Sequence, residues 1–214
     1  MATFPQELID GYRTFTTQRL PTEQTRYREL SERGQSPEVM VIGCCDSRVS
    51  PEVIFDAGPG ELFVMRNIAN LVPVYQPDGG AHGVSAALEY AVSVLRVKHI
   101  VVLGHAQCGG IRAFIDNIEP LSPGDFIGRW MSMFIKPGER VEQRDHETMQ
   151  DFTIRIEKAA VFRSLENLLT FPFVKAAVER GELSLHGAYF GVAEGSLFVL
   201  DRDAKEFRAA QYSK

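Results

Sequence analysis

The sequence has few cysteines, no cluster of basic residues and no apolar run long enough to cross a bilayer. Its 214 residues carry a net charge of −5 at pH 7. This charge argues against nucleic acid or an anionic membrane as the main partner, because both are bound by clustered Lys and Arg. The first residues are polar and acidic where a secretion signal has a basic start and an apolar core. We therefore expect a cytoplasmic protein.

The three cysteines, Cys44, Cys45 and Cys108, are an odd number, and two of them are adjacent. A framework of paired disulfides is therefore not expected in a reducing compartment. Metal ligation, thiol chemistry and plain burial are the three roles left open by the cysteine count.

The remaining composition is typical of one globular domain. With 44% hydrophobic and 24% charged residues, the chain can bury one good-sized core. It contains no repeat, low-complexity tract or interdomain linker, so we expect residues 1–214 to form a single domain. Over residues 5–33 apolar side chains recur at helical spacing, and Pro21 is expected to divide this N-terminal arm into two helices.

Short apolar runs and helical patterns alternate after the arm. The runs over 39–43, 61–66 and 99–104 are predicted strands, and the pattern over 83–95 predicts a helix between the last two. A strand, helix, strand order joins parallel strands. Further helices are predicted after Gly109, over 146–169 and from Pro172, with late strands over 183–192 and 196–201. The sequence therefore predicts an α/β fold with a mostly parallel central sheet flanked by helices.

Two candidate metal ligands directly follow predicted strands. Cys44 comes after the strand over 39–43, and His105 comes after the strand over 99–104, each preceded by a glycine. Ligand crevices of α/β sheets lie at the carboxyl ends of their strands, so Cys44 and His105 are expected side by side. Cys108 lies three residues further on, within reach of a tight loop. Two thiolates and one imidazole suit zinc and leave a fourth tetrahedral position.

A single His-x-x-Cys is weak evidence, since a lone buried Cys is more often a small hydrophobic residue than a ligand. The position of both ligand groups after glycine-ended buried strands favours metal binding. For Cys45 burial is expected instead, because its side chain should point away from that of Cys44.

Asp46 and Arg48 complete the pattern Cys-x-Asp-x-Arg. One interpretation is a structural ion pair between them. The other is functional: Arg48 keeps Asp46 ionised and directed at a water on the metal, which Asp46 orients through a hydrogen bond.

Four motifs, in this order and spacing, resemble the β-class carbonic anhydrases. They are Cys44-Cys45-Asp46-Ser47-Arg48, GPGELFVMRNIAN over 58–70, ALEYAV from Ala87, and GHAQCGG over 104–110. The resemblance covers roughly residues 30–200 and is specific.

The resemblance implies one zinc per chain, bound by Cys44, His105 and Cys108, with Asp46 and Arg48 as the catalytic pair. The implied activity is the reversible hydration of carbon dioxide to bicarbonate and a proton, by attack of zinc-bound hydroxide. It also implies a homodimer or homotetramer, in which the arm packs on a partner subunit and the substrate pocket is built from both subunits. The matching pocket positions are Gln35, Phe63, Ile68 and Tyr90, for which ordinary packing is the alternative. Backbone amides around Gly109, at the start of a predicted helix, are expected to line the same pocket and to stabilise negative charge that develops on the substrate.

Some β-carbonic anhydrases have a non-catalytic bicarbonate site formed by a Trp, an Arg and a Tyr, and its occupation favours a closed, inactive form. At the matching positions this chain has Val41, Arg66 and Phe190. Because the indole and the phenol hydroxyl are missing, the resemblance implies the subgroup that lacks this site. Asp46 would be a zinc ligand only in such a closed form. For Arg66 we expect a structural salt bridge or a dimer contact instead.

Two other functions compete with carbonic anhydrase. A non-catalytic zinc or redox-thiol protein could carry the same cysteines, although a structural zinc normally has four protein ligands and leaves Asp46 and Arg48 unexplained. A closer rival is an enzyme of similar fold that hydrolyses carbon disulfide or carbonyl sulfide.

Overall fold

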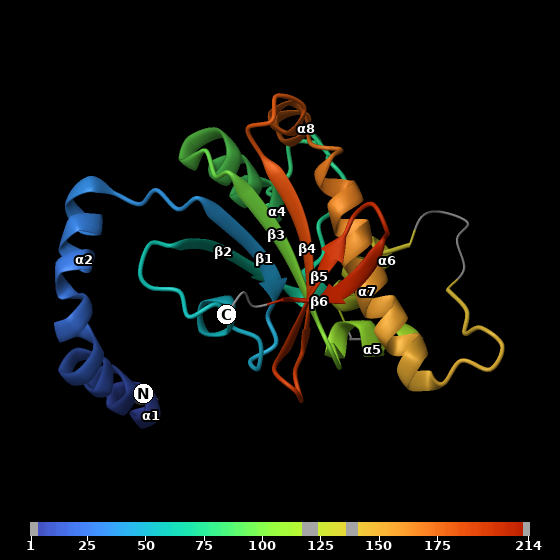
Figure 1. Ribbon diagram of the computed structural model, residues 1–214, viewed down its shortest axis with the longest axis horizontal. Helices are drawn as coiled ribbons and strands as arrows, with labels where there is room; N and C mark the ends of the chain where they lie inside the picture. Colours follow the sequence, from blue (N-terminus) through green and yellow to red (C-terminus); the bar gives the residue numbers. More distant parts are fainter. Residues whose placement is uncertain (1–3, 117–123, 136–140, 212–214) are drawn as a thin grey trace.

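A six-stranded sheet forms the centre of the computed structural model, which describes residues 4–116, 124–135 and 141–211 (Figure 1). Its strand order is β2-β1-β3-β4-β5-β6. The strands are β1 (Val39–Cys44), β2 (Leu62–Asn67), β3 (His99–His105), β4 (Ser184–Gly191), β5 (Ser196–Asp201) and β6 (Glu206–Ala209). The first four pair in parallel, whereas β5 and β6 are added antiparallel. The predicted α/β fold with a mostly parallel sheet is confirmed.

Helices surround this sheet at most of the predicted places. The α-helices are α1 (Gln6–Thr14), α2 (Leu20–Arg33), α3 (Pro51–Ile54), α4 (Gly83–Glu89), α5 (Gly109–Asp116), α6 (Phe126–Ser132), α7 (Met149–Leu168) and α8 (Pro172–Glu179). Two π-helical segments, η1 (Phe15–Arg19) and η3 (Tyr90–Leu95), and a 3₁₀ turn, η2 (Ile68–Asn70), complete them. The sequence predicted neither α6 nor β6, because both are short and a four-residue edge strand has little periodicity. No helix in the described ranges is long and apolar enough to span a bilayer.

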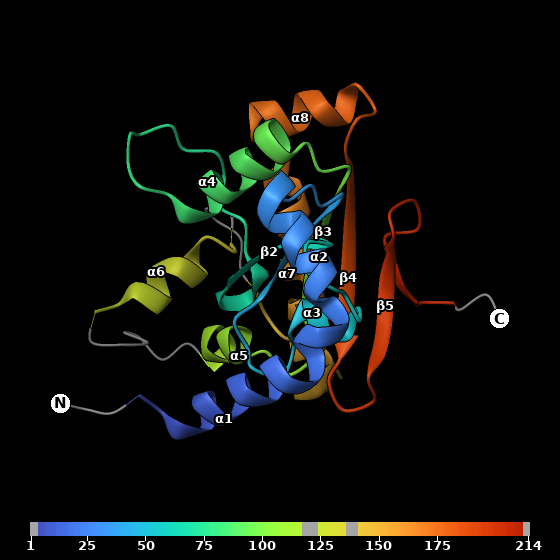
Figure 2. The same cartoon turned by 90° about the vertical axis from the view of Figure 1, so that its left-hand side faces the viewer.

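The N-terminal arm is one continuous helical segment, made of α1, η1 and α2, that projects from the sheet (Figures 1 and 2). The expectation that Pro21 divides it is wrong. Pro21 stands in the first turn of α2 and follows a π-helical turn, where the missing N–H and the ring are tolerated. The arm meets the rest of the chain through Arg26 Nε, which donates to the Pro59 carbonyl at 3.3 Å, and through Leu30 beside Gly60.

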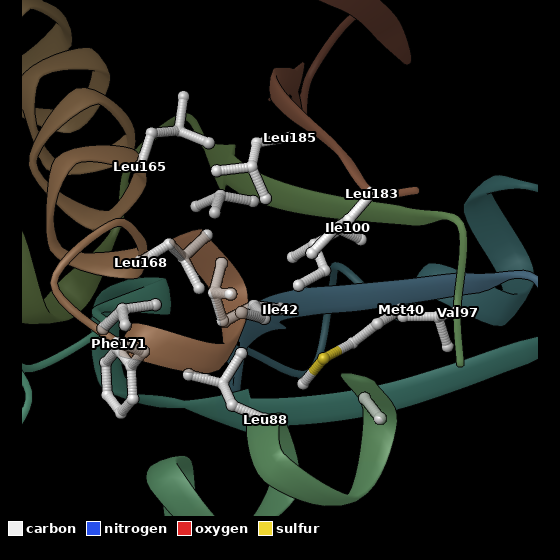
Figure 3. Packing of buried hydrophobic residues seen from close by; sticks show 14 of the residues in the cluster. Met40, Ile42, Leu88, Val97, Ile100, Leu165, Leu168, Phe171, Leu183 and Leu185 are labelled. Atoms are coloured by element: carbon white, nitrogen blue, oxygen red, sulfur yellow. The ribbon is translucent and has the colours of Figure 1, made fainter. Parts of the chain in front are cut away.

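The main core lies between the sheet and helices α4, α7 and α8 (Figure 3). Met40 and Ile42 of β1 pack here with Ile100 of β3, Leu88 of α4 and Leu168 of α7. Alternate residues of the same strands, such as Val41, are buried on the opposite face of the sheet. The strands are therefore apolar on both faces, as parallel strands with both faces covered usually are. This packing fixes their carboxyl ends, where the candidate ligands lie.

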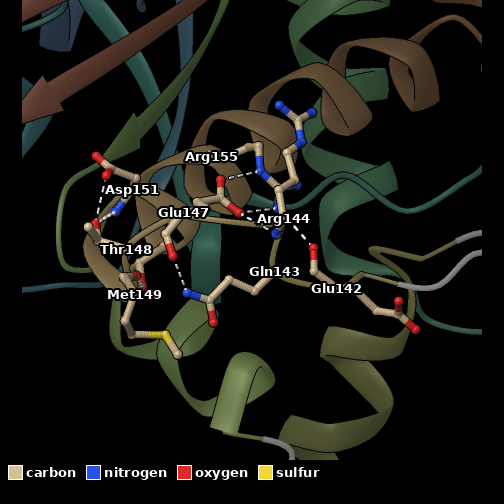
Figure 4. Close-up of polar contacts among 9 residues, drawn as sticks. Glu142, Gln143, Arg144, Glu147, Thr148, Met149, Asp151 and Arg155 are labelled. Atoms are coloured by element: carbon tan, nitrogen blue, oxygen red, sulfur yellow. Dashed lines mark hydrogen bonds and ion pairs between the residues drawn. The ribbon is translucent and has the colours of Figure 1, made fainter.

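The start of α7 is fixed by polar contacts (Figure 4). Thr148 is the N-cap residue, and its hydroxyl oxygen accepts the Asp151 amide hydrogen at 3.1 Å. One residue earlier, Glu147 accepts from Arg155 Nε at 2.7 Å and from Arg155 Nη2 at 2.8 Å. These contacts position a helix that packs on β3 and β4 and runs past the carboxyl ends of both strands.

Candidate metal centre

The three predicted ligands come together at the carboxyl ends of β1 and β3. Cys44 is the last residue of β1 and His105 the last of β3, and the two strands are parallel neighbours. Cys108 lies in the loop between β3 and α5. The ligand atoms of all three residues lie within 4.8 Å of one another, and each residue is at most 4% exposed. Burial shields such a cluster from competing water and fixes its geometry.

The hydrogen bonding of His105 prepares its ring for a metal. Nδ1 lies 2.9 Å from the Ala106 carbonyl oxygen, so it carries the proton and donates it there. Nε2 is then a lone-pair donor, yet it is buried and has no hydrogen-bond partner within the described ranges. A buried nitrogen without a partner costs free energy unless something else binds it. A metal ion between Nε2 and the two sulfurs satisfies this requirement.

The two buried thiols behave as a pair. The pKa of Cys44 is lowered, because the Cys108 thiol donates a hydrogen bond to its sulfur and His105 adds to the effect against the opposing cost of burial. The pKa of Cys108 is raised, because its proton bridges to Cys44 and because the group is buried. Without a metal the pair therefore keeps one proton. A divalent cation takes the place of that proton and stabilises both thiolates.

Asp46 and Arg48 form a two-pronged ion pair next to the first ligand. Asp46 Oδ1 accepts from Arg48 Nε at 2.9 Å, and Oδ2 accepts from Arg48 Nη2 at 2.7 Å. These hydrogen bonds hold the pKa of Asp46 well below its usual range. Arg48 Nη2 also donates to the Gln107 carbonyl at 3.0 Å, which connects the loop of Cys44 to the loop of Cys108.

Arg66 holds the backbone of the first ligand loop. Its Nε donates to the Cys44 carbonyl and its Nη2 to the Asp46 carbonyl, each at 2.7 Å. The expected salt bridge is therefore replaced by hydrogen bonds to two main-chain oxygens. The side chains at the two matching positions, Val41 and Phe190, pack in one hydrophobic cluster.

The predicted pocket residues fall into two groups. Ile68 and Gly109 lie beside the ligands: Ile68 follows Asn67, which pairs with Cys44, and Gly109 follows Cys108. The two loops are in close contact, because a Cβ on Gly110 would come within 2.6 Å of Ile68 Cγ2.

The second group lies away from the ligands of its own chain. Phe63 contacts Tyr90, with ring centroids 5.9 Å apart, and pairs with Met40. Met40 lies four positions before Cys44 along β1, a rise of about 13 Å. Gln35 is exposed and precedes β1 altogether.

A cleft of about 680 Å³ opens beside the Cys108 loop. It is lined by Gly109, by residues of α7 and by the turn at Ala193 and Glu194, but by none of Gln35, Phe63, Ile68 and Tyr90. The cleft therefore does not join the two groups of predicted pocket residues within one chain.

Cys45 is exposed, so its predicted burial is wrong. β1 ends at Cys44, and the Cys45 amide donates to the Asn67 carbonyl at 2.9 Å. Because the strand ends before Cys45, strand alternation does not place its side chain in the core, and no part of the described chain covers it.

Sequence reasoning missed Glu157, a carboxyl that is 2% exposed and lies next to the metal centre. Its Oε1 accepts the Cys108 amide hydrogen at 2.9 Å, and burial raises its pKa. One signal could have revealed it: Glu157 has helical spacing to Val161 and Leu168, so a charged residue interrupts the apolar face of α7.

The chain is similar in sequence and in fold to known carbonic anhydrases. A family model described as carbonic anhydrase matches residues 39–197. Beta carbonic anhydrase 3 of Arabidopsis thaliana is 36% identical over 204 residues, which are 94% of this chain and 78% of that protein. The solved structure of the β-carbonic anhydrase CcaA has a TM-score of 0.87 at 28% identity, with 97% of this chain and 92% of that chain covered. One of two tetrameric β-carbonic anhydrases from the filamentous ascomycete Sordaria macrospora has a TM-score of 0.79 at 28% identity, with 92% and 96% covered.

Proposed function

This chain belongs to the β-carbonic anhydrase family, and on that premise we propose which of its residues carry out the reversible hydration of carbon dioxide. The observation that carries the proposal is the convergence of Cys44, His105 and Cys108 at one edge of the sheet, with the Asp46–Arg48 pair in the adjoining loop. A structural zinc site explains the three ligands but gives no role to that pair.

The donor set fits one zinc ion per chain. Two sulfurs and one imidazole nitrogen are soft and borderline ligands, and three protein ligands leave one position open, as in catalytic zinc sites. When bound, zinc supplies the Lewis acidity that activates water for attack on carbon dioxide.

Asp46 would accept a hydrogen bond from the attacking water and so direct its lone pair toward the carbon of the substrate. This role requires an ionised carboxylate in a fixed position. Arg48 provides both, through two hydrogen bonds to the carboxylate. Its third bond, to the Gln107 carbonyl, keeps the pair in register with the loop of Cys108.

The substrate pocket would be completed by a second subunit. Ile68 and Gly109 lie beside the ligands of their own chain, and the backbone amides near Gly109 begin α5, where they can stabilise negative charge that develops on the substrate. Gln35, Phe63 and Tyr90 lie too far along the sheet to serve their own site. In a dimer they would serve the neighbouring one: the rings give carbon dioxide an apolar surface, and Gln35 donates an amide hydrogen to a substrate oxygen.

The helical arm would form part of the dimer interface. No residue of α1 or α2 is buried in the single chain, although Leu8 and Tyr12 are large and apolar. An apolar helix face of this kind is normally covered by another surface. Dimers could associate further into tetramers.

The chain would lack the non-catalytic bicarbonate site. What supports this proposal is that two Arg66 donors, Nε and Nη2, are already bound to main-chain carbonyls. An anion there would compete with these bonds without the indole and hydroxyl that complete the pocket elsewhere in the family. A ligand shifts a two-state equilibrium only by its differential affinity, so we expect no closed form with Asp46 on the metal.

A stopped-flow hydration assay on protein of measured zinc content tests the proposal. We expect hydration to scale with zinc content, and chelation to abolish it while circular dichroism shows an intact fold. Turnover of carbon disulfide and carbonyl sulfide should be measured on the same sample. If the protein hydrolyses carbon disulfide or carbonyl sulfide faster than it hydrates carbon dioxide, the rival hydrolase is favoured.

A further inference from the structure

One buried carboxyl beside the metal centre takes no part in the reaction proposed above. Glu157 lies in the middle of α7, and its neighbours on the same helix face, Val161 and Leu168, belong to the hydrophobic core. Its hydrogen-bond donors are the Cys108 amide and the Tyr189 hydroxyl, neither of which carries a charge. A buried carboxyl of this kind costs free energy unless its oxygens are hydrogen-bonded.

Both Glu157 oxygens are bound by fixed, buried groups. Oε1 accepts the Cys108 amide hydrogen at 2.9 Å, and Oε2 accepts the Tyr189 hydroxyl hydrogen at 2.6 Å. Tyr189 belongs to β4, and the Lys158 ammonium lies 5.3 Å from its ring centroid. The Tyr189 hydroxyl satisfies the second oxygen, while Glu157 itself is held in place by α7, which packs on β3 and β4.

The close approach of α7 makes this contact possible. Gly104 precedes His105 at the end of β3, and a Cβ at that position would come within 2.6 Å of Val161 Cγ2. Because Gly104 has no side chain, α7 lies against the strand end. Glu157 is one helical turn before Val161, which places it level with the ligand loop.

The Cys108 loop is held from two sides. Arg48 Nη2 donates to the Gln107 carbonyl on one side, and Glu157 accepts the Cys108 N–H on the other. The two anchors hold the carbonyl and the N–H of one peptide group, the one between Gln107 and Cys108. Immediately before this peptide group Gln107 has φ 57°, a left-handed conformation that a Gln rarely adopts without support from its surroundings. Loss of either anchor would let the loop relax and move the Cys108 sulfur.

We propose that Glu157 is a positioning residue of the metal centre: it fixes the Cys108 amide and thereby holds the Cys108 sulfur toward Cys44 and His105. It contacts the main-chain amide of Cys108 rather than the ligand sulfur, and it would act through that main chain. The proposal rests on the zinc site proposed above and adds a contact that supports it from behind. Hydrogen bonds that orient ligands in this way typically change metal affinity 10–100-fold.

Three variants test whether the length or the charge of the Glu157 side chain matters. In Glu157→Gln the side-chain oxygen still reaches the Cys108 amide, and the amide group can donate to the Tyr189 oxygen. In Glu157→Asp the charge is kept, but the chain is one methylene shorter and the contact is lost. Tyr189→Phe keeps the Cys108 contact and serves as the control for general disturbance of the core.

Zinc affinity is measured by competition with a chromogenic chelator, and ligand geometry by the visible spectrum of the cobalt-substituted protein. We expect Glu157→Asp to bind zinc about 10–100-fold more weakly, with altered cobalt bands. Glu157→Gln and Tyr189→Phe should stay within about threefold of the parent, with parental spectra. Parental affinity in Glu157→Asp, or an equal loss in Glu157→Gln, would overturn the proposal.

Hydrogen exchange of the Cys108 amide in the metal-free protein tests the contact independently of zinc. The amide should exchange slowly in the parent and in Glu157→Gln, and about tenfold faster or more in Glu157→Asp. Rapid exchange in the parent would overturn the proposal even if Glu157→Asp does not fold. A wrong assignment of the zinc site would give a different result. Cys44→Ser would then keep its zinc, while the Cys108 amide would still exchange slowly in the parent and in Glu157→Gln.

Discussion

The metal centre and the N-terminal arm differ in how far a single chain completes them. Cys44, His105 and Cys108 come from one chain and are almost fully buried. In the arm, by contrast, Leu8 is 59% exposed and Tyr12 is 65% exposed, and no residue of either α-helix is buried.

This difference indicates which properties should depend on assembly. Zinc binding needs only atoms that one chain brings together. Turnover should also need the partner, because Phe63 and Tyr90 lie away from their own zinc ligands. Variants that affect only one of the two regions can therefore separate metal content from activity.

The largest effect is expected from loss of a zinc ligand in the metal centre, which a single chain completes. Cys44→Ser should lower zinc from about one per chain to nearly none, because a serine hydroxyl is not ionised at neutral pH and is a poor ligand for zinc. The exposed neighbour provides the control, and Cys45→Ser should keep its zinc. Metal analysis after dialysis checks both variants. If Cys45→Ser loses its zinc and Cys44→Ser keeps it, the ligand is Cys45 rather than Cys44.

The next largest effect is on turnover alone. Asp46→Asn should lower kcat roughly 100-fold while zinc content stays near that of the parent. The uncharged amide is a weaker hydrogen-bond acceptor for the attacking water, and it is held less firmly by Arg48. Stopped-flow hydration and metal analysis on the same sample test this. Ser47→Ala, an exposed change in the same loop, is the matched control. Equal losses of zinc and activity in Asp46→Asn would make Asp46 a structural residue.

A medium effect is expected from the arm. The double variant Leu8→Asp and Tyr12→Asp should raise the dimer dissociation constant by about 100-fold or more, because charges replace apolar contacts at the interface. Activity per zinc should then fall on dilution, with zinc content unchanged. Sedimentation velocity over a concentration series measures the assembly. Gln24→Asp adds one negative charge at an exposed polar position of α2 and should keep the parental assembly. Parental behaviour of the double variant would remove the arm from the interface.

A small, pH-dependent effect is expected at the start of α7. Ion pairing with Arg155 lowers the pKa of Glu147 from 4.5 to about 2. Because the pKa is lowered in the folded state, the ionised Glu147 stabilises the fold above pH 4.5. This contribution is lost as the pH falls toward 2 and the carboxylate is protonated. Glu147→Gln should therefore lower the melting temperature by about a degree or two near neutral pH, and the difference from the parent should vanish in strong acid.

Thermal melts at several pH values test this, with Asp145→Asn as a neighbouring control. A difference that persists unchanged at low pH would rule out the ion pair as its source.

The smallest expected effect is the response to bicarbonate. Activity should fall gradually with added bicarbonate, as for a product at the active site, without a steep cooperative loss near neutral pH. A crystal grown in bicarbonate should keep Asp46 paired with Arg48. Bicarbonate beside Arg66 together with a bond from Asp46 to zinc would contradict this prediction.

Much of the candidate site could be predicted because its signals are local. Cys44 and His105 each follow a glycine at the end of an apolar run, and parallel pairing of those runs places the two side by side. Cys108 follows from its three-residue distance to His105. The arm was predicted as helical from its periodicity, but its continuity through Pro21 was not, because a π-helical turn has no clear sequence pattern.

The chemistry of the metal centre can be deduced from local sequence alone: two thiolates, one imidazole and an Asp–Arg pair at strand ends. The surroundings of the centre depend instead on tertiary packing. Cys45 is exposed because no part of the described chain covers it, and Arg66 binds carbonyls 22 and 20 residues away in the chain. Glu157 reaches an amide 49 residues away. Such contacts depend on how close α7 and the strands approach one another, and that distance is set by packing of the whole core rather than by any local pattern.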